Sequence, residues 1–301
     1  MKPKLPAYRS GSSALTPLCV IAFLFTVMFV GRQAHSQRVG MAPTQPQLAA
    51  PPGTSGLPSN MDAAQLVLGN KNLASSKDLN RKEDNCFLPP LNELHIATVG
   101  VTDLQVPSKV QQEFEDGCAA VKSRKMADAE NHLRKVVKQY EKYAAAWVLL
   151  GQVLEVQQKS DEARDSCSRP LTTVSNYLPA YLCLTDIAAR LKNWDETLKL
   201  SIRALEIDPT SSASAYAYNA TANLKLHHLA EAEKSALRAS EIDSKHSEPR
   251  LLYLLAQIYA AKGDLPNTAA QLRQYLKFAT DPDDASVVKG YLAKLEGPSG
   301  K

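Results

Sequence analysis

The sequence predicts an all-α protein built from repeated helical hairpins. Similar residues recur about every 34 residues, and each period holds two apolar stretches of helical spacing joined by a short polar turn. Aromatic residues make up only 6% of the 301-residue chain, which is low for a β-sandwich. Hydrophobic residues reach 44% and charged residues 22%, so most of the chain can bury a core.

The first segment, residues 1–36, has the features of an export signal. A basic start precedes an uncharged apolar run at residues 14–30, and the small residues Ala34 and Ser36 suit cleavage after Ser36. The run is also long enough for the alternative of an uncleaved anchor helix, and a third alternative is that it serves neither role. Cys19 lies inside the run and not after it, so a lipoprotein signal is not expected. In either of the first two cases the remaining chain is expected to be exported, to the periplasm, the cell envelope or the extracellular space.

The net charge of +4 is confined to that first segment. Of the 35 Lys and Arg residues, four lie in residues 1–36, which leaves 31 against 31 Asp and Glu residues. A neutral remainder gives no electrostatic reason to expect binding to nucleic acid or to acidic lipid. Contact with a membrane is therefore expected only through an N-terminal anchor.

Two further segments precede the repeats. Residues 37–85 are predicted to be a disordered linker, because they are rich in Pro, Gly and Ser and have no apolar periodicity. Residues 86–109 are predicted to be an extended arm. Within it, residues 96–101 are β-prone and would form one short strand or lie on the first helix.

The repeats are predicted to occupy residues 110–282, followed by an amphipathic capping helix at residues 283–296. The small residues Gly151 and Ala163 are expected where the two helices of one unit approach closely. Pro170 falls within the second helix of the same unit and should kink or end it. The five units start near residues 110, 144, 178, 213 and 249.

This pattern resembles the tetratricopeptide repeat. The resemblance is carried by the motif Trp-x2-Leu-Gly-x2-Leu at residues 147–154, by Ala163 after it, and by a second helix that closes on Glu-Ile-Asp-Pro at residues 206–209. The rival interpretation is a helical bundle whose spacing is accidental, and five regularly spaced copies argue against it. The resemblance implies a right-handed superhelical array whose first helices line a concave groove.

By that resemblance, positions 2, 5, 9 and 12 of each unit face the groove. Apolar residues such as Phe114, Val148 and Leu182 stand where a clamp for a terminal carboxylate would need basic or amide groups, so a polypeptide segment resting on an apolar floor is expected. The alternative is that this face packs the chain's own arm or a second copy. The candidate partner-binding residues are Phe114, Val121, Val148, Gln152, Glu155, Leu182, Asp186, Thr221, Leu224, Arg250, Tyr253 and Gln257. Equivalent positions hold Gln111, Cys118, Ala145, Pro179, Ala189, Ser214, Ala217 and Ala260.

Four cysteines follow the first segment, and their spacing matches no zinc site. Cys167 and Cys183 fall on adjacent helices of neighbouring units, so a disulfide between them is geometrically reasonable. A bridge from Cys86 to Cys118 would tie the arm to the first unit. The alternative for both pairs is that the cysteines are small buried apolar residues.

The function expected from these features is a non-enzymatic scaffold or adaptor of the cell envelope that binds protein or peptide partners, with self-association as an alternative. It is expected to need no cofactor and no metal. The pair His227-His228 is interpreted as part of a polar turn between helices, and not as a metal site. A second hypothesis is an accessory subunit of an envelope assembly or secretion machine. A third is an enzyme that uses Cys118 or His132, although the sequence holds no supporting catalytic motif.

Overall fold

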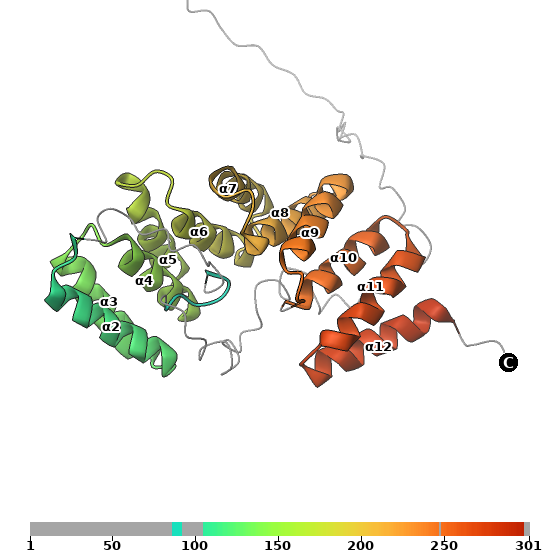
Figure 1. Cartoon of the computed structure of the whole chain (residues 1–301), viewed down its shortest axis with the longest axis horizontal. Coiled ribbons are helices and arrows are strands. Elements are labelled where there is room, and N and C mark those ends of the chain that lie inside the picture. The colour runs from blue at the N-terminus through green and yellow to red at the C-terminus, as the bar shows by residue number, and fades with distance from the viewer. Residues whose placement is uncertain (1–85, 92–104, 247, 298–301) are drawn as a thin grey trace, which may run out of the picture. The chain divides into compact units, whose positions relative to one another are not determined.

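The computed structural model describes residues 86–91, 105–246 and 248–297, and within these ranges it contains eleven α-helices, one 3₁₀ helix and no strand (Figure 1). The all-α fold class is therefore confirmed. The predicted export signal, the linker and the β-prone stretch at residues 96–101 lie outside the described residues. Among the described helices, none combines the length and the hydropathy that a membrane span requires. The helices are α2 (Ser108–Lys122), α3 (Met126–Gln139), α4 (Ala144–Val156), α5 (Ser160–Ser168), α6 (Leu178–Arg190), α7 (Trp194–Ile207), α8 (Ala213–Lys225), α9 (Leu229–Ile242), α10 (Arg250–Ala261), α11 (Leu265–Phe278) and α12 (Pro282–Glu296).

The helices of the described region pack as five consecutive pairs, α2 with α3 through α10 with α11, and α12 packs on α11. Each pair also contacts the next one along the chain, as repeat proteins require. The first helices of successive pairs contact one another as well, α4 with α6, α6 with α8 and α8 with α10. We call the side of α2, α4, α6, α8 and α10 that carries the candidate groove residues the inner face.

A turn of the same backbone form joins the two helices of every pair. In the first pair, the N–H of Lys125 donates to the carbonyl of Ala120 and the N–H of Arg124 donates to the carbonyl of Val121, both at 2.9 Å. These two bonds satisfy carbonyl groups at the end of the first helix, which compensates for the left-handed backbone of the turn residue. The turn residues and their φ angles are Arg124 (58°), Gln158 (64°), Lys192 (58°), His227 (62°) and Gly263 (77°).

The two helices of the second pair approach each other closely at Gly151, as predicted. A Cβ atom added there would lie 2.2 Å from the Sγ of Cys167 and 3.0 Å from the carbonyl oxygen of Ala163. Only a residue without a side chain fits this position. Further along the same pair, α5 ends at Ser168 and a 3₁₀ turn, Arg169–Thr172, carries the chain through Pro170, as expected for a proline in a helix.

The last helix, α12, covers the open side of the final pair. Its Val288 and Tyr291 are buried in one apolar cluster with Leu272 and Tyr275 of α11. Asp281 caps the start of α12, because its carboxylate accepts hydrogen bonds from the backbone N–H groups of the second and third residues that follow. The predicted capping helix is thus present, and its apolar side chains pack on the last helix pair.

Ion pairs link consecutive second helices on the outer side of the array. Arg134 of α3 donates to Glu162 of α5 at 2.5 Å, and Arg164 of α5 donates to both carboxylate oxygens of Glu196 of α7, at 2.5 and 3.0 Å. The hydrogen bond from Arg164 lowers the pKa of Glu196 below its usual value. Because both side chains are partly exposed, each such pair adds only a modest stabilisation.

The contact at Gly151 can be tested by substitution. Gly151→Ala is expected to lower the free energy of unfolding by roughly 1–3 kcal/mol, because the new methyl group collides with Cys167. Gly290→Ala in α12 is the matched control, since a Cβ there meets no atom within 4 Å. The control is expected to stabilise by roughly 0.5–1 kcal/mol through helix propensity. Urea unfolding measures both, and equal stability of Gly151→Ala and wild type would contradict the packing described.

The pair Arg164–Glu196 predicts a pH-dependent stability. A carboxyl whose pKa is lowered on folding stabilises the fold above its unfolded pKa, and that contribution disappears as the pH falls through the lowered value. Arg164→Met is therefore expected to cost ~0.5 kcal/mol at neutral pH, and the difference from wild type should shrink below about pH 4. The control is Arg238→Met, whose partner Glu241 lies on the same helix, and it should have a smaller effect. A loss for Arg164→Met that does not change with pH would show that the pair is not its cause.

Candidate functional site

A segment from before the repeats, Cys86–Leu91, lies on the inner face, and we call it the arm segment. Its three attachments reach α2, α4 and α8, so the segment crosses several helix pairs (Figure 1). All three partners, Cys118, Gln152 and Ser214, occupy predicted groove positions. The attachments are the disulfide Cys86–Cys118, the hydrogen bonds between Leu88 and Gln152, and the hydrogen bond of 3.5 Å from Ser214 Oγ to the carbonyl oxygen of Pro90.

Gln152 holds the main chain of the arm segment. The backbone N–H of Leu88 donates to Gln152 Oε1 at 3.0 Å, and Gln152 Nε2 donates to the carbonyl oxygen of Leu88 at 2.9 Å. The amide thereby pairs with both backbone groups of one residue, as a neighbouring β-strand would. Gln152 is only 7% exposed, so loss of these bonds would leave buried polar groups unpaired. This contact between Gln152 and Leu88 is made to the main chain and does not involve the leucine side chain.

The arm segment also buries apolar side chains on the inner face. Leu88 is 4% exposed and Leu91 is 0% exposed, and both belong to one core cluster with Val121, Val148 and Leu182. Three residues that the sequence marks as groove candidates are therefore buried together with the arm segment. In this arrangement they are not open to another chain.

Phe114 and Tyr253 pack within the array. The ring of Phe114 lies 4.8 Å from the ring of Tyr143, the residue before α4. The ring of Tyr253 is 2% exposed and lies 5.7 Å from that of Tyr275, and burial raises the pKa of Tyr253 to about 12. These two aromatic residues therefore join neighbouring helices.

A polar cluster spans α4, α6 and α8. The Tyr218 hydroxyl donates to Asp186 Oδ1 at 2.7 Å, and Arg190 Nε donates to Asp186 Oδ2 at 2.8 Å. Burial raises the pKa of Tyr218 well above its ordinary value. Burial also raises the pKa of Glu155, whose Oε2 atom is buried and accepts no hydrogen bond from the described residues. Of the candidate residues in this part of the inner face, Glu155 has unused capacity to accept a hydrogen bond.

The remaining candidates lie on α8 and α10. Thr221 is buried and donates to the carbonyl of Ala217 one turn earlier, and Leu224 packs against an apolar cluster formed by α8, α9 and α10. Arg250 and Gln257 are half-buried and keep part of their surface accessible. Beyond the arm segment the face has a pocket lined by Pro90, Ala213, Ser214, Ala217, Tyr218, Glu248, Arg250 and Leu251.

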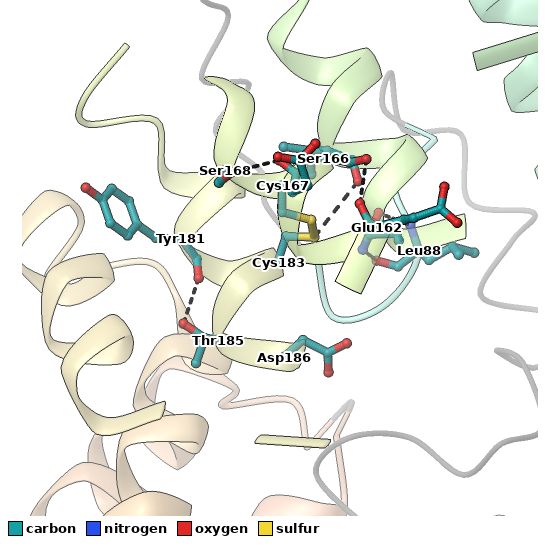
Figure 2. Close-up of a disulfide and its surroundings, with 12 residues drawn as sticks. Leu88, Glu162, Ser166, Cys167, Ser168, Tyr181, Cys183, Thr185 and Asp186 are labelled. Atoms are coloured by element: carbon teal, nitrogen blue, oxygen red, sulfur yellow. Dashed lines mark hydrogen bonds between the residues drawn. A yellow bond between two sulfur atoms is a disulfide. The ribbon is translucent and has the colours of Figure 1, made fainter. Parts of the chain in front are cut away.

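The structure pairs the four described cysteines. Besides Cys86–Cys118, a disulfide joins Cys167 of α5 to Cys183 of α6 across neighbouring pairs, with Cα atoms 6.0 Å apart (Figure 2). Figure 2 also shows Asp186 one turn after Cys183 on α6. Cys118 is one of the two residues that the third hypothesis names, and because it is in a disulfide it has no free thiol to act as a nucleophile.

The histidine residues considered for chemistry have structural partners. His132 Nδ1 lies 2.7 Å from Glu113 Oε1, which also accepts from Lys135 at 3.0 Å. His228 Nδ1 lies 3.3 Å from Asn223 Oδ1 in a turn between helices. Within the part of the chain that the structure describes, no group of three or more His, Cys, Asp or Glu residues is placed to hold a metal ion.

The sequence interpretation missed the role of Leu88, Leu91 and Arg190. The two leucines were part of an arm without assigned contacts, although Phe-Leu-Pro-Pro-Leu at residues 87–91 is an apolar run at the end of a polar linker. That contrast was the available signal that the run packs against something. Arg190 lies at position 13 of its unit, just outside the four positions assigned to the groove.

Comparisons with known proteins agree with this architecture. The family model described as tetratricopeptide repeat matches residues 114–172. No curated protein sequence matches the chain. The solved structure of PilW, described as a widely conserved type IV pilus biogenesis factor, is similar with a TM-score of 0.58 at 16% identity, over 64% of this chain and 88% of that one.

Two further solved structures are similar. A tetratricopeptide repeat protein from Parabacteroides merdae has a TM-score of 0.53 at 15% identity, over 64% of this chain and 75% of its own. A double mutant of MamA, with RS-1 in its description, has a TM-score of 0.51 at 14% identity, over 57% of this chain and 95% of that one. At these identities the similarity concerns the fold. The regular helix pairs, the repeated turn and the match at residues 114–172 lead to one conclusion: the described helices have the tetratricopeptide repeat fold.

Proposed function

We propose that the chain is a non-enzymatic scaffold that binds partner polypeptides on its inner face. The observation that carries the proposal is that this face already holds a polypeptide segment, through main-chain hydrogen bonds to Gln152 and through buried leucine side chains. The same chemistry suits a segment of another protein. Arg250 and Gln257 extend the face beyond the arm segment and keep accessible surface for such a partner.

We propose further that the protein works in the cell envelope after export. The basic and apolar pattern of residues 1–36 supports this location. The two disulfides support it as well, because disulfides persist mainly in oxidising compartments. A role in an envelope assembly machine is the second candidate, and it is favoured by the structural similarity to a protein described as a pilus biogenesis factor.

Partner capture tests the role of the inner face. The double variant Arg250→Ala/Gln257→Ala removes two half-buried polar side chains from this face. The matched control is Lys234→Ala/Gln274→Ala, which removes exposed polar side chains from the second helices α9 and α11. Wild type and control are expected to recover the same partner from an envelope extract, and the inner-face variant is expected to lose it. Equal recovery by all three proteins would refute binding through this part of the face.

Fractionation tests the location. In its native cells the protein is expected in an envelope or extracellular fraction, with Cys86, Cys118, Cys167 and Cys183 resistant to alkylation until a reductant is added. Mass spectrometry of the purified chain measures both the alkylation and any cleavage after Ser36. A cytoplasmic, unprocessed chain with four alkylatable thiols would contradict the proposed export.

A further inference from the structure

We infer that the arm segment is a built-in ligand of the inner face, and that this face binds a Leu-Pro-Pro-Leu turn supplied by a partner protein in the same way. The inference rests on the proposed function, since it names the chemical class of the partner. The occupant expected in trans is a short apolar segment with two leucines three positions apart and two prolines between them.

The shape of the arm segment defines what is recognised. Leu88, Pro89, Pro90 and Leu91 form a turn in which the N–H of Leu91 donates to the carbonyl oxygen of Leu88 at 3.0 Å. The two prolines have no N–H group, so the turn leaves no unpaired donor between the leucines. A single residue, Leu88, presents both of its backbone groups to Gln152. The turn therefore offers a compact apolar shape whose backbone groups at Leu88 and Pro90 meet Gln152 and Ser214 on the inner face.

The surface under the turn is complementary to it. Both leucines are almost fully buried, and they share one cluster with apolar side chains from α2, α4 and α6. Phe87 packs against the same cluster. Gln152 meets the arm segment among these buried apolar groups, and its amide both accepts from and donates to the backbone of Leu88. A partner segment that lacked an open N–H and carbonyl at the first leucine would leave this amide unpaired.

The disulfide explains why this site is occupied in the isolated chain. Cys86 precedes the turn by two residues and is bonded to Cys118 of α2. The disulfide gives the arm segment an effective concentration on the order of millimolar. To displace it, a free segment must be present at a comparable concentration or bind more tightly than the arm segment does. Pro90 of the arm segment lines a pocket that also includes Ser214, Glu248 and Arg250. A longer partner segment would add contacts to Glu248 and Arg250 in this pocket.

Peptide binding to the full chain tests the inference. The probe is a fluorescein-labelled peptide with the sequence of residues 84–94 and the substitution Cys86→Ser. The arm-released protein carries Cys86→Ser, Cys118→Ser, Leu88→Glu and Leu91→Glu, which remove the tether and both anchors. In fluorescence polarisation the peptide is expected to bind this variant in a saturable manner, and to bind wild type at least ~100-fold more weakly because the tethered arm competes.

Control variants separate specific recognition from apolar adhesion. Added to the arm-released protein, Gln152→Glu is expected to weaken peptide binding at least ~10-fold, because a carboxylate repels the carbonyl oxygen of Leu88. Gln139→Glu, at an exposed position at the end of α3, should leave it unchanged. A peptide with both leucines replaced by aspartate should not bind. Absence of binding to the folded arm-released protein would overturn the inference, and so would equal binding with and without Gln152→Glu.

A second measurement covers the case in which the arm-released protein loses its cooperative unfolding. The peptide must then restore the cooperative transition in trans, since a ligand that binds only the native state stabilises it. The aspartate peptide must fail to do so, and absence of rescue by the leucine peptide overturns the inference. Because only purified chain and peptide are used, this result is independent of the partner capture that tests the proposed function.

Discussion

Each helix pair of this chain carries apolar side chains that it cannot bury alone, and covering those side chains is the constraint on which the rest of the structure depends. Consecutive pairs cover one another, and the small residues Gly151 and Ala163 allow the helices of the second pair to come close enough for that. Two surfaces then remain without a next pair. The helix α12 covers the last pair, and the arm segment covers apolar side chains of α2, α4 and α6 on the inner face.

The helix α12 and the arm segment cover these surfaces through different interactions. The helix α12 packs by apolar contact along its whole stripe and begins at an aspartate cap. The arm segment has no regular structure of its own, so its backbone groups must find partners on the surface that it covers. Gln152 supplies them for Leu88, and Ser214 donates to Pro90. A surface that satisfies a backbone in this way has the properties of a polypeptide-binding site, which connects the packing constraint to the proposed function.

Local features of the sequence were sufficient to predict the helix pairs, the break at Pro170 and the capping helix, because each depends on spacing within one or two neighbouring units. The turn conformations were less accessible, since Arg124 and Lys192 adopt a left-handed backbone that their residue types do not indicate. The sequence could not predict which segment occupies the inner face. Leu88 and Gln152 are 64 residues apart, and no periodic pattern relates them. The sequence therefore left open whether the arm or a partner fills the groove.

Hydrogen exchange at the backbone amide of Leu88 tests the central claim most directly, because Gln152 Oε1 is the acceptor of that N–H group. In the full-length wild-type protein this amide is expected to exchange far more slowly than in a free peptide of the same sequence. The protection should disappear in Gln152→Ala while amides in the middle of α4 remain protected. If the Leu88 amide of the wild-type protein exchanges as fast as that of the free peptide, the arm segment does not occupy the inner face and the account is wrong.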